Sequence, residues 1–345
     1  MGKRFAASFI VYASVLGVLS LTPSSAQAAD YRAEYRLSTV LGSAFDWGKA
    51  GERWAELVKL KTDGRIVIKL YAGASLVGGD QTREFSAIRQ GVIDLAIGSS
   101  INWSPQVKQL NLFSLPFLTP DDKGLDALIK GKVGKELFAF LDQQGVVPLA
   151  YGENGFRELS NSRQPIKSPA DLKDLKIRIV GSPIFIDSFT ALGASPTQMS
   201  WTDAQPALAT KAVDGQENPL SVFNAAQLYA LGQNQLTLWG YMADPLIFVV
   251  NKQVWASWNE VDRKAVREAA DQAAAENIVA ARKGLSPGDD GLLKSIEKNG
   301  VAITRLTPYQ RRAFKEATRP VYDKWANVVG IDLVKKAEAA IDATR

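Results

Sequence analysis

Residues 65–100 read RIVIKLYAGASLVGGDQTREFSAIRQGVIDLAIGSS, which is two strand patterns on either side of a helix pattern. The segments 65–71 and 92–98 are short and mostly apolar, as buried strands are. The helix between them is capped by the Gly-Gly-Asp sequence at 78–80 and ends before Gly91. This strand–helix–strand order predicts a parallel sheet with right-handed crossovers.

The same alternation extends in both directions along the chain. The further strands that we expect are 33–40, 145–151, 175–180 and 246–251, with a short extended piece at 197–199. The further helices that we expect are one that ends at Asp63-Gly64, then 121–144, 183–192, 202–211, 252–283, 287–299, 308–325 and 330–343. Two α/β series without a Gly/Ser linker predict two lobes that are joined by several crossing segments.

Composition excludes many kinds of active site. The chain has 345 residues, 41 Lys and Arg against 36 Asp and Glu, and neither Cys nor His. The length indicates two domains, because single cores stop growing beyond roughly 250–300 residues. The missing Cys excludes disulfides and thiolate chemistry, and the missing His excludes Ser-His-Asp triads and imidazole acid–base catalysis. We therefore expect no group to titrate between about pH 5.5 and 8 unless a buried acid is strongly shifted.

The first 28 residues have the layout of a secretory signal peptide. Lys3 and Arg4 precede an apolar run at 5–21, and the small-residue triplet Ala-Gln-Ala follows at 26–28. The alternative is a membrane anchor, but an apolar run of about 17 residues is marginal for a span. We expect Sec-type export, cleavage before Ala29 and a mature chain that is soluble in the periplasm.

The segment LKIRIV at 175–180 contains the strongest candidate for a binding residue. Alternation along a strand places Arg178 on the face opposite Ile177 and Ile179. A guanidinium inside a parallel sheet needs a partner, since such strands are buried on both faces. A ligand carboxylate or an internal ion pair satisfies that need, whereas a twisted strand end would leave the arginine in solvent. The strand alone favours an ion pair or a solvated end over a ligand.

Other polar and aromatic residues are weaker candidates. Arg157 follows the strand that ends the first lobe and either points into a cleft between the lobes or lies in solvent beside Glu158. The segment DGQENP at 214–219 reads as a polar turn whose side chains could orient hydroxyl groups. Three aromatic residues, Trp201, Trp239 and Tyr241, could cover a ligand, although each alone is more often part of a core.

Motifs for nucleotide binding and for serine hydrolases are missing from the sequence. A pair of carboxylates could still hydrolyse glycosides without His, but no pair among the 36 acids stands out. No set of residues for catalysis, for a cofactor or for a metal therefore stands out in the sequence.

Five segments together resemble the extracytoplasmic solute-binding subunit of TRAP transporters, the DctP type. They are GGDQTRE at 78–84, GVIDL at 91–95, LKIRI at 175–179, GASPTQMSW at 193–201 and AVDGQENP at 212–219. The last is the most specific, and the similarity covers essentially residues 31–340. The resemblance implies an α/β periplasmic solute-binding fold with two lobes, a ligand cleft between them and a long inter-lobe helix.

The resemblance also implies roles for individual residues. Arg178 is expected to form the salt bridge to a ligand carboxylate, assisted by Arg157. Asn218 and Glu217 of the Glu-Asn-Pro segment are expected to line the pocket, as is the aromatic Trp201. The remaining expected pocket residues are Asp80, Ser99 and Ser100 of the first lobe, together with Trp239 and Tyr241.

The resemblance further implies a receptor that delivers a small organic acid to a small and a large TRAP membrane subunit. The expected division is a signal peptide at 1–28, lobe I at 29–153 plus about 243–283, and lobe II at 154–242 plus about 284–345. An ABC-type or sensor-linked binding protein has the same architecture and stays an alternative, as does a secreted carboxylate-pair hydrolase.

Overall fold

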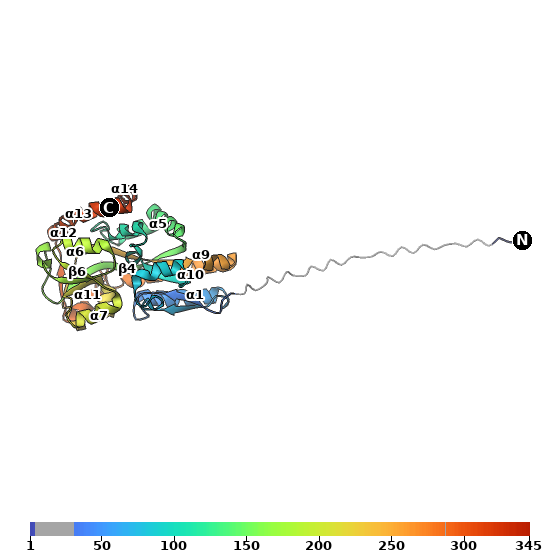
Figure 1. Ribbon diagram of the computed structural model, residues 1–345, viewed down its shortest axis with the longest axis horizontal. Coiled ribbons are helices and arrows are strands. Elements are labelled where there is room, and N and C mark those ends of the chain that lie inside the picture. Colours follow the sequence, from blue (N-terminus) through green and yellow to red (C-terminus); the bar gives the residue numbers. More distant parts are fainter. Residues whose placement is uncertain (4–30, 287) are drawn as a thin grey trace. The chain divides into compact units, whose positions relative to one another are not determined.

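A computed structural model of the chain describes residues 1–3, 31–286 and 288–345 (Figure 1). The segment Tyr31–Arg345 forms one compact unit. The predicted signal peptide lies almost entirely outside the described residues. In the part of the chain that is described, no helix is both long and apolar enough to cross a membrane.

The first half of the sheet confirms the predicted strand–helix–strand order. Strand β1 (Tyr35–Ser38) pairs in parallel with β2 (Ile68–Tyr71) and with β3 (Leu95–Ser99), and helix α1 (Asp46–Lys61) connects β1 to β2. Asp80 caps the expected helix, which consists of η2 (Gln81–Arg83) followed directly by α2 (Glu84–Arg89), and η1 (Ser75–Val77) precedes it. Gly78 and Gly79 have φ of 68° and 82°, outside the helical range, and separate η1 from η2.

Two strands run through both halves of the sheet. Strand β4 (Val146–Asn161) extends ten residues beyond the predicted end at Tyr151, and β9 (Ala243–Asn251) lies antiparallel to it. Their register shifts between Glu153 and Gly155, where Gly155 has φ of 127°. Beyond this irregularity β4 pairs with strands of the second half, so the two lobes share continuous strands.

The second half of the sheet contains strands that the sequence analysis missed. Besides β5 (Lys176–Ile179) and β6 (Ser195–Gln198), it contains β7 (Gly215–Pro219), β8 (Gln235–Leu238) and β10 (Ala302–Arg305). The prediction of a polar turn at 214–219 is wrong, because β7 is a fully buried strand between β4 and β5. The order along the main path is β2-β1-β3-β9-β4-β7-β5-β6.

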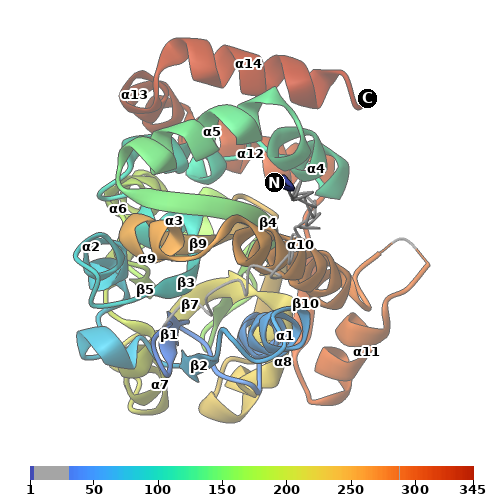
Figure 2. The same cartoon turned by 90° about the vertical axis from the view of Figure 1, so that its right-hand side faces the viewer.

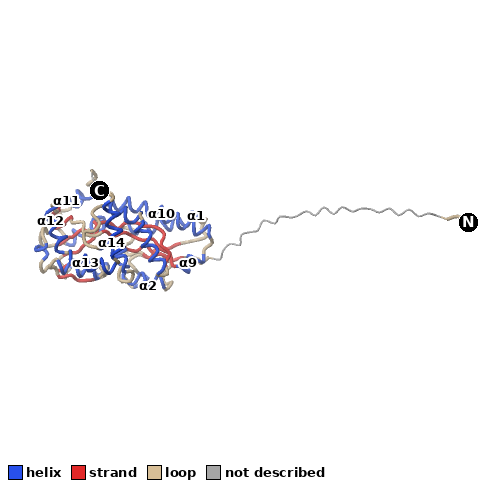
Figure 3. Tube along the Cα trace, turned by 90° about the horizontal axis from the view of Figure 1, so that it is seen from above, coloured by secondary structure: helices blue, strands red, loops and turns tan. Residues whose placement is uncertain are grey.

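Helices cover both faces of this sheet (Figures 2 and 3). Helices α4 (Asp122–Lys130), α5 (Lys132–Gln143) and α14 (Ile331–Asp342) pack together on one side, and α10 (Glu260–Arg282) packs on α1 and β4. The others are α3 (Ser100–Trp103), η3 (Lys108–Ser114), η4 (Pro169–Leu172), α6 (Pro183–Ala191), α7 (Trp201–Ala209), α8 (Leu220–Ala225), η5 (Leu228–Leu231), α9 (Lys252–Ser257), α11 (Gly291–Lys298), α12 (Pro308–Ala317) and α13 (Arg319–Val329).

The hydrophobic core lies in two layers, one on each face of the sheet. Strand β9 shows this directly: Ile247 and Val249 belong to one cluster, and Phe248 and Val250 belong to the other. The alternation of side chains along the strand places successive residues on opposite faces. Because both faces of the sheet are covered, a polar side chain on either face is buried where β4 and β9 pass from one half to the other.

Candidate ligand-binding site

A narrow cavity of about 20 Å³ lies beside the point where β4 and β9 cross between the two halves of the sheet. This volume has room for about one water molecule, so an organic acid enters only if the walls move apart. The residues that line it are Val40, Leu41, Trp47, Gln81, Ser99, Asn102, Asn154, Arg157, Arg178, Val180, Trp201, Asn218 and Asp244.

Arg178 is a buried cation in the wall of this cavity. It lies on β5, is 1% exposed, and donates from Nε and Nη2 to the carbonyl oxygen of Met199 at 3.1 and 2.9 Å. Among the described residues, no carboxylate lies within salt-bridge distance of it. Burial lowers the pKa of Arg178 to about 10, and the more distant Glu217 only partly opposes this. The guanidinium is thus buried without the anion that a buried charge requires.

Arg157 has the internal ion pairs that Arg178 lacks. Its guanidinium contacts both carboxylate oxygens of Glu217, and Nη1 lies 3.2 Å from the carboxylate of Asp244. Nη2 also donates to the side chain of Asn218 at 3.1 Å. Burial opposes the charged form, but Glu217 and Asp244 outweigh it and hold the pKa of Arg157 above its ordinary value.

Asp244 and Asn154 are site residues that the sequence analysis missed. Asp244 accepts hydrogen bonds from Ser99 Oγ at 2.5 Å and from Asn154 Nδ2 at 2.8 Å, in addition to its contact with Arg157. Burial raises the pKa of Asp244, and Arg157 opposes that shift. Since Ser99 ends β3 and Arg157 lies beyond the irregularity in β4, this carboxylate joins the two halves of the sheet.

The protein itself supplies equal numbers of positive and negative groups around the cavity. Two buried guanidiniums, of Arg157 and Arg178, face two buried carboxylates, of Glu217 and Asp244. Both carboxylates contact Arg157, however, so the positive charge at Arg178 is left toward the cavity. The arrangement is suited to a small anion that carries further polar groups.

Comparison with known proteins places the chain in a family. The profile of the bacterial extracellular solute-binding proteins, family 7 (DctP), matches residues 37–327. The chain belongs to this family.

Solved structures and relatives of family 7 agree with the observed fold. A TRAP periplasmic solute-binding protein from Ralstonia eutropha H16, with bound (S)-2-acetolactate, is 64% identical, with a TM-score of 0.90 over 91% of this chain and 100% of that chain. The sugar acid binding protein DctPAm from Advenella mimigardefordensis, in complex with galactonate, is 27% identical, with a TM-score of 0.84 over 90% and 98%. The 2,3-diketo-L-gulonate-binding periplasmic protein YiaO of Escherichia coli K12 is 31% identical over 94% of this chain and 96% of its own.

Five of the predicted site residues line the cavity of this family 7 protein: Arg178, Arg157, Asn218, Trp201 and Ser99. Trp201 is 8% exposed, and its ring lies over Arg178 at 5.9 Å. Glu217 lies behind the wall, where it pairs with Arg157. The prediction that Glu217 contacts a ligand directly therefore gains no support from its position.

Four other predicted residues are not among those that line the cavity. Asp80 caps η2, where it accepts hydrogen bonds from the backbone nitrogen and the hydroxyl of Thr82. Ser100 is buried at the start of α3. Trp239 and Tyr241 pack against each other in the core, with ring centroids 4.2 Å apart, and Tyr241 donates to Glu217 at 3.1 Å. These aromatic residues support the ion pair and do not cover the cavity.

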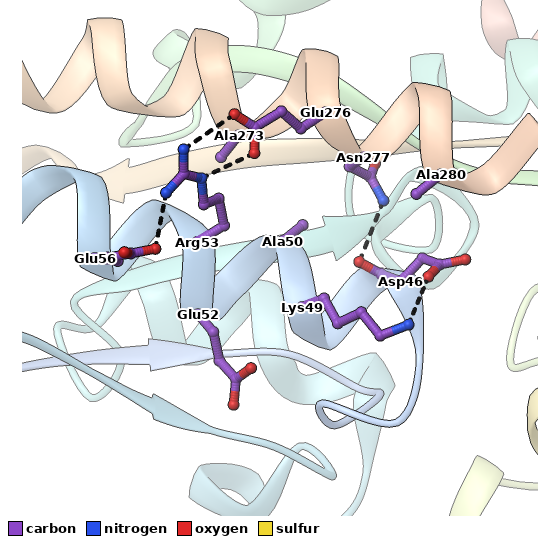
Figure 4. A pocket seen from close by; sticks show the side chains of 10 residues that line it. All are labelled: Asp46, Lys49, Ala50, Glu52, Arg53, Glu56, Ala273, Glu276, Asn277 and Ala280. Carbon is purple, nitrogen blue, oxygen red and sulfur yellow. Dashed lines mark hydrogen bonds and ion pairs between the residues drawn. The ribbon is translucent and has the colours of Figure 1, made fainter.

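A second, wider hollow lies between α1 and α10, away from Arg178 (Figure 4). Its charged side chains are satisfied by one another: Arg53 contacts both Glu56 and Glu276, and Lys49 contacts Asp46. The groups are largely exposed, so these pairs contribute little binding or stability. No unpaired buried charge of the kind seen at Arg178 is found among the residues that line it.

Three buried glutamates are acids of the kind that could titrate near neutral pH in a protein without His. Burial raises the pKa values of Glu84, Glu153 and Glu158 each to about 7. Glu84 accepts from Ser38 Oγ at 2.6 Å and Trp103 Nε1 at 3.1 Å, and among the described residues it has no cationic partner within salt-bridge distance. The stated exception of a strongly shifted buried acid therefore applies to this fold.

Replacing Glu84 with Gln is expected to change how stability depends on pH. The pKa of Glu84 rises from 4.5 to about 7 on folding, so between these values the unfolded chain loses a proton that the folded chain keeps. The fall in the free energy of unfolding over that pH window is therefore expected to be about 3 kcal/mol smaller in Glu84→Gln than in the wild type, because Glu153 and Glu158 still titrate in both proteins. Urea denaturation at pH 5 and pH 8 measures the difference, with the exposed Glu316→Gln as the control. Equal pH dependence of Glu84→Gln and wild type would contradict the assignment.

Proposed function

We propose that this chain is the extracytoplasmic receptor of a TRAP-type importer and that it binds a small organic acid through Arg178. The observation that carries the proposal is the buried guanidinium on β5 without an internal carboxylate partner. A ligand carboxylate supplies the missing anion and can accept two parallel hydrogen bonds from a guanidinium. Membership of family 7 supports a binding role without catalysis.

The ligand that we propose is a branched 2-hydroxy-3-oxo acid of the acetolactate type. The 64% identical protein from Ralstonia eutropha holds (S)-2-acetolactate, whereas galactonate is held by a structure that is only 27% identical. The wall of the cavity combines the apolar side chains of Val40, Leu41 and Val180 with polar groups at Asn154 and Asn218, which suits methyl groups beside oxygen atoms.

We also propose the division and location of the chain that the sequence indicates. The signal at 1–28 directs export to the periplasm, and lobes I and II divide near Glu153 and near Asp244, where the register between β4 and β9 shifts. The partners are a small and a large membrane subunit of the TRAP type. The contacts of α14 with α4 and α5 then lie across the two lobes and tie them together on one face.

A thermal-shift experiment with the mature chain tests the proposed ligand. At a concentration one hundred times Kd, (S)-2-acetolactate is expected to raise the Tm by roughly 5 °C, because ligand binding to the native state stabilises it by about 2.7 kcal/mol. D-glucuronate at the same concentration is the comparison and is expected to produce a much smaller shift. No shift with 2-acetolactate, or a larger one with glucuronate, would overturn the proposed ligand class.

A further inference from the structure

The residues that line the cavity are largely enclosed, so a ligand reaches Arg178 only when the walls separate. Arg178 is 1% exposed, Ser99 2% and Trp201 8%. The two halves of the sheet meet over the cavity along one short line of contacts. We call this line the seam and define it as residues 79–82 of the β2–β3 connection with residue 181 and residues 198–202.

Gln81 makes the central hydrogen bonds of the seam. Its Oε1 accepts from the backbone nitrogen of Trp201 at 3.0 Å, and its Nε2 donates to Asn102 Oδ1 at 2.8 Å. Trp201 begins α7, so its N–H is one of the helix-end donors that need a partner outside the helix. Gln81 is 4% exposed and supplies that partner from the other half of the sheet.

The segment that Gln81 fixes is the segment that holds Arg178. The guanidinium donates twice to the carbonyl oxygen of Met199, and the ring of Trp201 lies 5.9 Å from it. Displacing residues 199–201 therefore displaces both the acceptor and the aromatic cover of the arginine. Residues 199–201 therefore link closure of the seam to the position of the Arg178 guanidinium.

Gly181 and Thr82 meet at the other contact of the seam. A Cβ placed on Gly181 would lie 2.4 Å from Thr82 Cγ2, far closer than atoms can approach, and Gly181 does not have a positive φ. The reason for glycine here is therefore space and not backbone conformation. Thr82 is held in place because its nitrogen and hydroxyl both donate to Asp80, at 3.1 and 2.7 Å.

The geometry points to the seam as the closure device of the receptor: Gln81 is a positioning residue that fixes Trp201 and Arg178, and Gly181 leaves the room that Thr82 needs. This inference rests on the proposed function, since closure matters only if the cavity receives a ligand. Because a ligand shifts the protein toward the closed state only by contacts that the open state lacks, seam contacts add directly to affinity.

The first experiment measures affinity for (S)-2-acetolactate by calorimetry. Gly181→Ala is expected to raise Kd about tenfold, because the added methyl group keeps the seam apart. Adding Thr82→Ser removes Cγ2 but keeps the hydroxyl, so the double variant is expected to return to within about threefold of wild type. The control is Gly291→Ala on α11, whose Cβ meets only an Asp289 oxygen at 3.4 Å. Wild-type affinity in Gly181→Ala, or no rescue by Thr82→Ser, would overturn the inference.

The second experiment needs no ligand. The chain has no Cys, so Thr82→Cys with Gly181→Cys gives a protein in which one disulfide can form, and the close approach of these side chains suits one. Intramolecular oxidation, followed by non-reducing electrophoresis, is expected to be rapid and to slow about fivefold when Gln81→Met is added. Gln90→Met, at an exposed Gln on the same connection, is expected to leave the rate unchanged.

The two experiments separate the inference from the proposed ligand. Failure of the wild type to bind 2-acetolactate would refute that ligand, while the disulfide experiment would still decide whether the seam forms. A Cys pair that does not close, or one whose rate ignores Gln81→Met, would refute the seam. Circular dichroism at the assay temperature shows that each variant is folded.

Discussion

Arg178→Met is expected to abolish binding of the acid while leaving the protein at least as stable as the wild type. Binding is lost because the ligand carboxylate would be buried without its cation, which typically costs about 2–5 kcal/mol or more. Stability is kept because holding this guanidinium charged costs the wild type free energy: burial lowers the pKa of Arg178 to about 10, well below the ordinary value of an arginine. That shift corresponds to about 3 kcal/mol, offset in part by the two hydrogen bonds to Met199.

Calorimetry measures the loss of affinity, and urea denaturation measures the stability. The matched control is Arg89→Met, which removes an exposed arginine at the end of α2 and should change neither quantity. A loss of stability of more than about 2 kcal/mol in Arg178→Met would show that this arginine has a structural role that the observed contacts do not reveal.

Arg157→Met is expected to have the opposite signature, with a large loss of stability of about 3–5 kcal/mol. Removing this guanidinium leaves the carboxylates of Glu217 and Asp244 buried without their common cation. Urea denaturation at pH 7 measures the effect. Adding Glu217→Gln removes one of the stranded charges and is expected to restore part of the stability. If Arg157→Met and the wild type unfold at the same midpoint urea concentration, the ion pairs of Arg157 do not stabilise the fold as proposed.

The two arginines show how far sequence reasoning reaches. Alternation along residues 175–180 correctly placed Arg178 inside the sheet, but a strand in isolation could not tell a ligand clamp from an ion pair. In the structure, the two nearby carboxylates pair with Arg157 and not with Arg178. Glu217 and Asp244 come from strands that are 60 and 87 residues further along the chain, and only the topology brings them to one arginine.

The segment at 214–219 shows the opposite limit. Asp-Gly followed by polar residues and Pro is a turn signal, yet residues 215–219 form a buried strand. Its polar side chains are satisfied by distant groups: Gln216 donates to Ser160, and Glu217 accepts from Arg157 and Tyr241. Local propensity was overridden by tertiary pairing, which a single sequence does not reveal.

Aromatic residues and buried acids show a further limit, because their environment depends on the fold. Trp239 and Tyr241 are aromatic residues of the kind that often covers a ligand, but here they belong to the core behind the ion pair of Arg157 and Glu217. The absence of His correctly excluded imidazole catalysis and yet did not fix the titration behaviour, since burial alone brings Glu84 into the neutral range. Burial is a property of the fold, and residue type alone does not supply it.

The central claim is that Arg178 binds a ligand carboxylate by two parallel hydrogen bonds. The most direct test is calorimetric titration of (S)-2-acetolactate into the wild type and into Arg178→Lys, which keeps the charge but loses the planar pair of donors. The account predicts a clear binding heat for the wild type and none for Arg178→Lys at the same concentrations. Equal affinity of the two proteins would contradict it.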